Sequence, residues 1–237
     1  IGQMGKMLGR DVVGRKFHKL FYGFSIAKVT EQELRQIRGI QGVREIYESM
    51  DYMPTLMESV PSISADSTWQ TQSTPQGNLG QGMRIGIIDT GIDYTLKDLG
   101  GCFGSGCRVE GGYDFQNNDA DPMDDQGHGT HVAGITASNG KLLGVAPQAR
   151  LYAIKVLGVM GGSAEDVIAG MEYAADPDGD PLTNDRLDVV NMSLGADCYG
   201  YSKDCGPDDP VSQAADTLSD AGTSVVVAAG NSGPGDS

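Results

Sequence analysis

Two short segments of the sequence hold side chains that could perform nucleophilic catalysis. Asp89 follows the apolar run 85–88, and His128 stands between Gly127 and Gly129 where an apolar helical pattern begins. A carboxylate at the end of a buried strand is partly desolvated, and a histidine that donates from its second ring nitrogen is its natural partner. Small neighbours of the histidine leave room for a peptide to approach. The two segments therefore predict an Asp and a His of a charge-relay system.

Each of these residues also has a simpler interpretation. Asp89 could cap its own loop together with Thr90 and Gly91. His131 lies three positions after His128, so the two could form a His-x-x-His metal pair. A zinc site would need a third ligand and a water-activating Glu nearby, and neither is evident. We expect His131 to be a buried, hydrogen-bonded core residue instead.

A third candidate, Asn231, follows the apolar run 224–229 in a glycine-rich turn. An amide donor held there could stabilise an oxyanion, although an asparagine in a turn is common and by itself indicates nothing more.

Short apolar runs alternate with helical patterns from residue 83 onward. The pattern predicts strands at 83–88, 150–157, 187–193 and 224–229 and helices at 127–138, 164–175 and 210–221. Nearly continuous apolar strands are typical of a parallel sheet, and right-handed crossovers place helices on both of its faces. We therefore expect an α/β fold. In such sheets ligands bind at the carboxyl ends of the strands, where Asp89, Ser193 and Asn231 would share one edge.

The first 52 residues are typical of a small α+β unit. They predict a strand at 21–29, a helix at 31–38 that opens with a capping-box-like Thr30–Glu33, and a strand at 42–47. The segment 50–82 is rich in Ser, Thr, Pro and Gly, which predicts a linker or irregular structure.

Charge divides the sequence in the same place. Residues 1–52 hold nine Lys or Arg and six Asp or Glu, a net charge of +3, while the remainder carries −18. The acidic body argues against nucleic acid as a partner, because phosphates would be repelled. The basic segment is either a solvated surface or a small module that docks on the acidic body. No apolar run approaches the roughly 20 residues that span a membrane.

Four cysteines form two close pairs, Cys102 with Cys107 and Cys198 with Cys205. Neither spacing matches a common zinc pattern, and no histidine lies near either pair. We expect two local disulfides, which implies an oxidising compartment.

Together these segments resemble the subtilisin-like serine proteases, the subtilases of peptidase family S8. The resemblance rests on five motifs in the family's order: Asp-Thr-Gly-Ile-Asp93, His-Gly-Thr-His-Val-Ala-Gly134, Gly-Val-Ala-Pro147, Asn-Met-Ser-Leu-Gly195 and Ala-Ala-Gly-Asn231. They cover most of residues 60–237.

The resemblance implies that Asp89 orients the general base, that His128 is that base and that Asn231 is the oxyanion donor. It also implies a protein or peptide substrate that binds as an added strand. The residues that would receive this strand are Ser193, Leu194, Gly195, Gly161 and Gly162.

The resemblance implies three parts in the chain. Residues 1–52 would be the C-terminal part of a ferredoxin-like inhibitory pro-segment, 53–82 a linker and the start of the mature enzyme, and 83–237 an incomplete N-terminal part of the catalytic domain. The protein would then be a secreted, monomeric zymogen with its own pro-segment as intramolecular inhibitor. We expect autocleavage between Tyr47 and Met57.

One family motif has no counterpart here. The nucleophilic serine belongs to a Gly-Thr-Ser-Met-Ala helix start, which this sequence lacks. We therefore expect a precursor fragment that shows no meaningful protease activity alone. The chemistry needs no cofactor. A structural calcium ion is conceivable at Asp98, but the loop 138–143 that would supply further ligands is short, and Asp176–Asp180 is more typical of a plain acidic turn than of a calcium loop.

Two other functions compete with this one. An aspartic protease also carries Asp-Thr-Gly, but it needs a second such carboxylate and an all-β fold. A non-catalytic binding module, or pseudoprotease, could use the basic segment for regulation.

Overall fold

The computed structural model describes residues 13–17, 23–26, 29–44, 46, 60–69, 78–180, 182–195 and 209–229. The chain forms two compact units, residues 1–53 and 54–237. The limit expected after residue 52 falls close to this division, while the limit expected after residue 82 and the assignment of residues 1–52 to a pro-segment stay predictions.

The smaller unit pairs β1 (Val13–Phe17) antiparallel with β2 (Gly23–Ile26) and adds α2 (Glu31–Arg38). α2 has the predicted bounds because its capping box is complete: the amide of Glu33 donates to Thr30 Oγ1, and the amide of Thr30 donates to the Glu33 carboxylate. The structure differs from the sequence analysis at two places. β1 was not foreseen, and the described residues of the expected strand, 42–44 and 46, form a turn and irregular backbone.

The larger unit is built on a five-stranded parallel sheet in the order β4-β5-β3-β6-β7. Its strands are β3 (Arg84–Asp89), β4 (Val109–Asp114), β5 (Arg150–Lys155), β6 (Val189–Met192) and β7 (Ser224–Val227). The predicted α/β fold is confirmed, and the all-β fold of an aspartic protease is excluded. β4 was not predicted, because Gly111 and Gly112 interrupt its apolar pattern.

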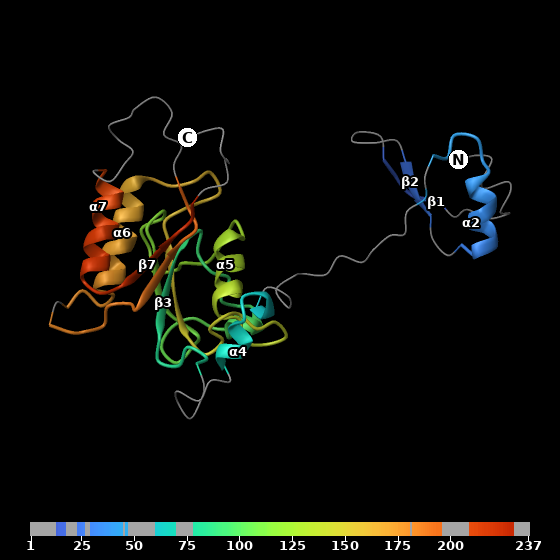
Figure 1. Ribbon diagram of the computed structural model, residues 1–237. Coiled ribbons are helices and arrows are strands. Elements are labelled where there is room, and N and C mark those ends of the chain that lie inside the picture. Colours follow the sequence, from blue (N-terminus) through green and yellow to red (C-terminus); the bar gives the residue numbers. More distant parts are fainter. Residues whose placement is uncertain are drawn as a thin grey trace. The chain divides into compact units, whose positions relative to one another are not determined.

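Helices cover both faces of this sheet (Figure 1). The helices are α5 (His128–Ala137), α6 (Ala164–Ala175) and α7 (Pro210–Asp220). α5 packs with Ile85 and Ile87 on one face, while α6 and α7 pack with Ile88 and Ile154 on the other. Because side chains alternate along a strand, Asp89 points to the face of α5.

The segment expected to be a linker contains ordered structure. Ala65–Trp69 forms the short helix α4, Val60 and Ala65 are buried, and the Trp69 indole donates a 2.9 Å hydrogen bond to the Val145 carbonyl. The prediction of irregular structure was therefore wrong at these residues.

Cys102 and Cys107, the first of the two expected pairs, are joined by a disulfide, while Cys198 and Cys205 lie outside the described residues. Within the described part of the chain, none of the helices has the length and apolar character needed to cross a membrane.

Candidate active site

Asp89 and His128 meet at the carboxyl end of β3. The His128 Nδ1 atom lies 2.7 Å from Asp89 Oδ1, which also accepts the Thr90 amide at 2.8 Å. A carboxylate only accepts hydrogen bonds, so Nδ1 carries the proton and Nε2 keeps its lone pair. Asp89 is fully buried, whereas the His128 side chain is 45% exposed. The pair therefore presents a basic nitrogen at the surface and hides the group that orients it.

The glycines beside His128 have different roles. A Cβ atom on Gly129 would lie 2.2 Å from the Gly91 carbonyl and 3.1 Å from Asp89 Cβ, so only glycine allows α5 to come this close to β3. Gly127 caps the helix with φ 101°, and no atom lies within 4 Å of where its Cβ would be. Only Gly127 borders open space. Gly129 is buried and sets the approach of His128 to Asp89.

His131 does not lie where it was expected. The buried residues of α5 are Gly129, Ala133 and Ala137, four positions apart, and His131 is two positions from the nearest of them on the exposed side of the helix. The prediction of a buried core histidine was wrong, because residues two apart on a helix face opposite sides. Among the described residues, no potential metal-binding group includes either histidine.

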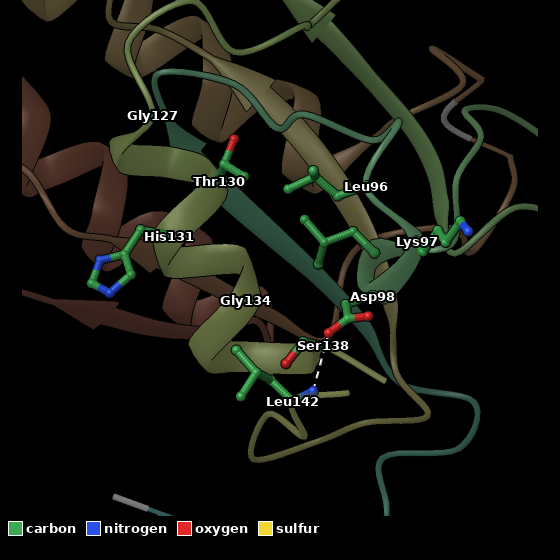
Figure 2. Close-up of a pocket in the computed structure, with 10 residues that line it drawn as sticks. Leu96, Lys97, Asp98, Gly127, Thr130, His131, Gly134, Ser138 and Leu142 are labelled. Atoms are coloured by element: carbon green, nitrogen blue, oxygen red, sulfur yellow. Dashed lines mark hydrogen bonds between the residues drawn. The ribbon is translucent and has the colours of Figure 1, made fainter. Parts of the chain in front are cut away.

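A cavity of about 460 Å³ lies between α5 and the segment 96–99 (Figure 2). Asp98 borders it, and its carboxylate accepts the Leu142 amide at 3.0 Å. The Asp98 carbonyl accepts the Asn139 amide at 2.8 Å. Asp98, which was considered as a calcium ligand, thus anchors the short loop that follows α5.

The acidic turn after α6 brings three carboxylates together. Ligand atoms of Asp176, Asp178 and Asp185 lie within 4.8 Å of one another. Desolvation, then the charges of Asp185 and Asp178, raise the pKa of Asp176. Thr183 donates to Asp178 and the Asp178 amide donates to Asp185, so hydrogen bonds within the turn already use these two groups, whereas Asp176 Oδ1 is buried without a hydrogen-bond partner.

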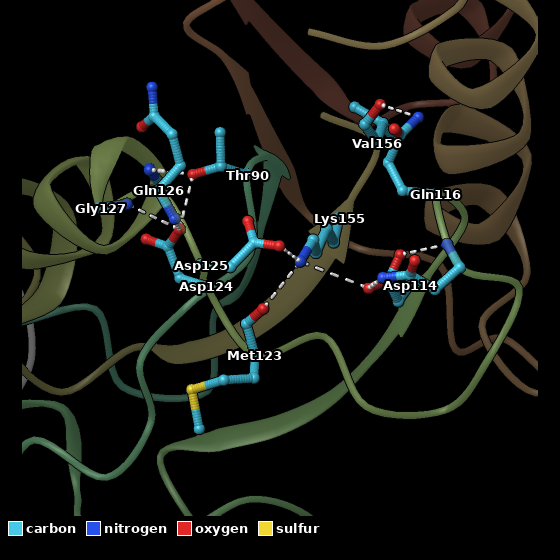
Figure 3. A network of polar contacts seen from close by, with 12 residues as sticks. Thr90, Asp114, Gln116, Met123, Asp124, Asp125, Gln126, Gly127, Lys155 and Val156 are labelled. Carbon is cyan, nitrogen blue, oxygen red and sulfur yellow. Dashed lines mark hydrogen bonds and ion pairs between the residues drawn. The ribbon is translucent and has the colours of Figure 1, made fainter. Parts of the chain in front are cut away.

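Asp124 organises the first turn of α5 (Figure 3). Its Oδ1 accepts the amides of Gln126 and Gly127 and the hydroxyl of Thr90, and its Oδ2 accepts the amide and hydroxyl of Thr130. Burial alone would raise the pKa of this carboxyl, but the hydrogen bonds hold the pKa below its ordinary value.

The hydroxyl of Thr90 extends this network to the helix. It donates to Asp124 and accepts the Gly129 amide at 2.8 Å. The residue after the candidate carboxylate is therefore tied to the residue after the candidate base. The sequence indicates for Thr90 only a loop cap with Asp89, and it does not single out Asp124, although an Asp just before a helical pattern is a signal for a helix start.

The two expected substrate-binding edges follow strands that flank β3 in the sheet. Ser193, Leu194 and Gly195 follow β6, and Ser193 Oγ accepts the Asn191 amide group at 2.9 Å. On the other side, Gly158 and Gly161 exchange two backbone hydrogen bonds after β5, and Gly161 and Gly162 are exposed. Both segments thus lie at the edge of the sheet that carries Asp89. Asn231 lies outside the described residues.

Comparison with known proteins identifies the family. The family model described as "Subtilase family" matches residues 80–237, which include Asp89 and His128. The chain belongs to the subtilase family.

Its relatives include bacterial proteases, one of which is named as extracellular. It is 35% identical to the minor extracellular protease Vpr of Bacillus subtilis, over 97% of this chain and 29% of that protein. It is 39% identical to the serine protease AprX of the same organism, over 65% of this chain and 34% of that protein. Subtilisin DY of Bacillus licheniformis is 38% identical, over 76% of this chain and 56% of its own length. The chain therefore spans between about a third and about half of the length of these relatives.

Proposed function

We propose that the protein is a serine endopeptidase that hydrolyses peptide bonds by acyl transfer. The observation that carries this proposal is the 2.7 Å hydrogen bond between buried Asp89 and half-exposed His128 at the carboxyl edge of the sheet. Membership of the subtilase family and the names of its relatives support the same chemistry.

In this mechanism His128 Nε2 removes the proton from a serine hydroxyl as that oxygen attacks the substrate carbonyl. Asp89 keeps the ring in the correct tautomer and stabilises the imidazolium that forms. Asn231 and a backbone amide hold the oxyanion of the tetrahedral intermediate. His128 then gives its proton to the leaving amine, and water releases the acyl group in a second, similar step. The 237 residues contain no counterpart of the family's Gly-Thr-Ser-Met-Ala motif, from which this serine is expected.

The substrate is an extended polypeptide. It lies between the segments 161–162 and 193–195, which follow the two strands on either side of β3. The backbone of Gly161 is already hydrogen-bonded to Gly158, so the exposed backbone of Gly162 is what offers an amide and a carbonyl group to an added strand. No metal takes part in the chemistry, and any bound calcium ion has a structural role.

The protein is secreted and made as a zymogen whose residues 1–52 form part of an inhibitory pro-segment. Support for secretion comes from the word "extracellular" in the name of the relative Vpr, which matches 97% of this chain. N-terminal sequencing of the secreted, mature protein tests this directly. A first residue between Tyr47 and Met57 is expected, and a start well outside that window would refute the cleavage site. Both limits lie outside the described residues.

Two histidine variants of the full-length protein test the catalytic role. His128→Ala should lower kcat for casein cleavage by several orders of magnitude, because the general base is lost. His131→Ala is the matched control on the exposed face of the same helix, and it should cleave casein at a near wild-type rate. A His128→Ala enzyme that matures and cleaves normally rules out the proposed role.

Inhibitors separate this function from a protease of another class. A serine-directed phosphonylating agent should abolish casein cleavage by the full-length protein, and a statine-type inhibitor should leave it unchanged. A full-length protein that reacts with no such agent and cleaves nothing would favour a pseudoprotease that only binds polypeptides.

A further inference from the structure

A buried lysine lies beside the candidate catalytic pair. Lys155 ends β5, where it stands in register with Asp89 of β3 on one side and Asp114 of β4 on the other. Leu151 and Ala153 of the same strand pack on the face of α5, so by alternation the Lys155 side chain points to that face too. The residue is 2% exposed. An ammonium group in that position needs partners, because an unpaired buried charge is strongly unfavourable.

The partners of Lys155 come from two different segments (Figure 3). Its Nζ atom lies 3.5 Å from Asp114 Oδ2 at the end of β4. It also lies 3.0 Å from Asp125 Oδ2 and donates to the Met123 carbonyl at 3.1 Å. Burial alone would lower the pKa of Lys155, but the Asp125 and Asp114 carboxylates raise it above its ordinary value.

One of the partners of Lys155, Asp114, belongs to the sheet, and the other two, Met123 and Asp125, do not. Asp114 is 1% exposed, belongs to β4 and also accepts the amide and side chain of Asn117. Met123 and Asp125 belong to the segment 121–127, which has no regular secondary structure and leads directly into α5. Lys155 therefore connects the sheet to the segment that carries the start of the helix.

The same segment controls the first turn of α5. Asp124 lies between the two groups that Lys155 holds, and its carboxylate binds Gly127, Thr130 and Thr90. The His128 amide donates to Gln126 Oε1 at 2.9 Å. A displacement of residues 123–125 would therefore move the residue whose ring must stay within hydrogen-bonding distance of Asp89.

We propose that Lys155 is a positioning residue: its buried ammonium group fixes the segment 121–127 and thereby holds the His128 ring against Asp89. It acts through Met123 and Asp125, which are its partners in that segment. The role rests on the proposed function of His128, but the geometry that it maintains is measurable without any hydrolysis.

The test observes the His128 ring in the 237-residue chain by NMR. The sequence has three histidines, so the ring signals are few, and a His128→Gln variant assigns the one of interest. In the wild type, the Nδ1 proton held by Asp89 should give a far-downfield resonance. Lys155→Met keeps an unbranched side chain but removes the charge, and the His128 Nδ1 resonance should be lost. The ring signals of exposed His131 on the same helix should not change.

Two further variants complete the design. Arg150→Met, at the other end of β5, removes an exposed ion pair with Glu110 and should leave the His128 resonance unchanged. Asp125→Asn removes a partner of Lys155 whose side chain is 51% exposed, so the fold should tolerate it, and the resonance should shift and broaden. If Lys155→Met does not fold, Asp125→Asn decides the question.

A folded Lys155→Met chain with an unchanged His128 Nδ1 resonance would overturn the proposal. If Lys155→Met is unfolded, an unchanged His128 Nδ1 resonance in Asp125→Asn would overturn it instead. Neither result bears on catalysis. Conversely, a full-length protein without peptidase activity would refute the proposed function but would leave the link between Lys155 and His128 intact.

Discussion

Gly129 offers the sharpest test of how α5 is placed on the sheet. In Gly129→Ala the new Cβ would start 2.2 Å from the Gly91 carbonyl oxygen and 3.1 Å from the Thr90 nitrogen. Backbone atoms cannot turn aside as a side chain can. The first turn of α5 must therefore move by about 1 Å to restore an ordinary contact, which would lengthen the 2.7 Å bond between His128 and Asp89 to about 3.7 Å. That distance is too long for a hydrogen bond.

The energetic cost follows from the same geometry. Overpacking against rigid atoms costs about 1–3 kcal/mol, and the better helix propensity of alanine returns about 1 kcal/mol. With the loss of the His128–Asp89 bond, Gly129→Ala should lower the free energy of unfolding by about 2 kcal/mol or more. In the full-length enzyme, a misplacement of about 1 Å should also lower kcat by about 10²-fold.

Gly134→Ala is the matched control, because Gly134 lies in the same helix and no atom is within 4 Å of where its Cβ would lie. It should raise the free energy of unfolding by up to about 1 kcal/mol. Urea denaturation followed by Trp69 fluorescence and by circular dichroism measures both variants. A Gly129→Ala chain as stable as Gly134→Ala, with the His128 Nδ1 resonance intact, would refute this account of helix placement.

Two further predictions concern the two ends of α5. The pKa of Asp124 is lowered in the folded protein, so its contribution to stability is present above its unfolded pKa of about 3.9 and is lost as pH falls through the folded pKa. Asp124→Asn should therefore unfold more easily than the wild type at pH 7 but not at about pH 2, and an equal difference in urea midpoint at both pH values would contradict this. At the other end, the Arg108 guanidinium donates to the carbonyls of Ala137, Pro147 and Ala149. Arg108→Met should lower the free energy of unfolding by about 1–3 kcal/mol, because these carbonyls lose their donor. The His128 Nδ1 resonance should persist in Arg108→Met, and its loss would show that the two ends of the helix are coupled.

Local signals in the sequence predicted the helices well. α2 and α6 begin and end at the expected residues, because Thr30 and Ser163 each form a capping box with an acidic residue three positions later. The alternation of apolar runs and helical patterns likewise predicted a parallel sheet with helices on both faces. The Asp89–His128 pair followed from this order, since a strand end and a helix start meet at the carboxyl edge.

Other features depend on contacts that no local pattern contains. β4 carries two consecutive glycines, and it forms because Val109–Asp114 pairs with β5. α4 is held by the hydrogen bond between Trp69 and Val145, 76 residues away in the chain. Residues of both segments look like loop residues until their partners are known.

The supporting residues of the site were missed for a related reason. Lys155 is a cation at the end of an otherwise apolar strand, which is a signal of a buried charge, but its partners come from positions 114, 123 and 125. The wrong prediction that His131 is buried has a different cause. The small residues at 129, 133 and 137 mark the buried side of α5, and their spacing of four already places His131 opposite.

The central claim is that Asp89 orients His128 as a general base. It is tested most directly by kcat/KM for a peptide substrate of the full-length Asp89→Asn protein, compared with the wild type at equal concentrations of folded enzyme. An amide at position 89 can hold the ring in the wrong tautomer, so kcat/KM should fall by about 10⁴-fold while the fold is kept. A folded Asp89→Asn enzyme that cleaves the peptide at the wild-type rate would contradict the claim.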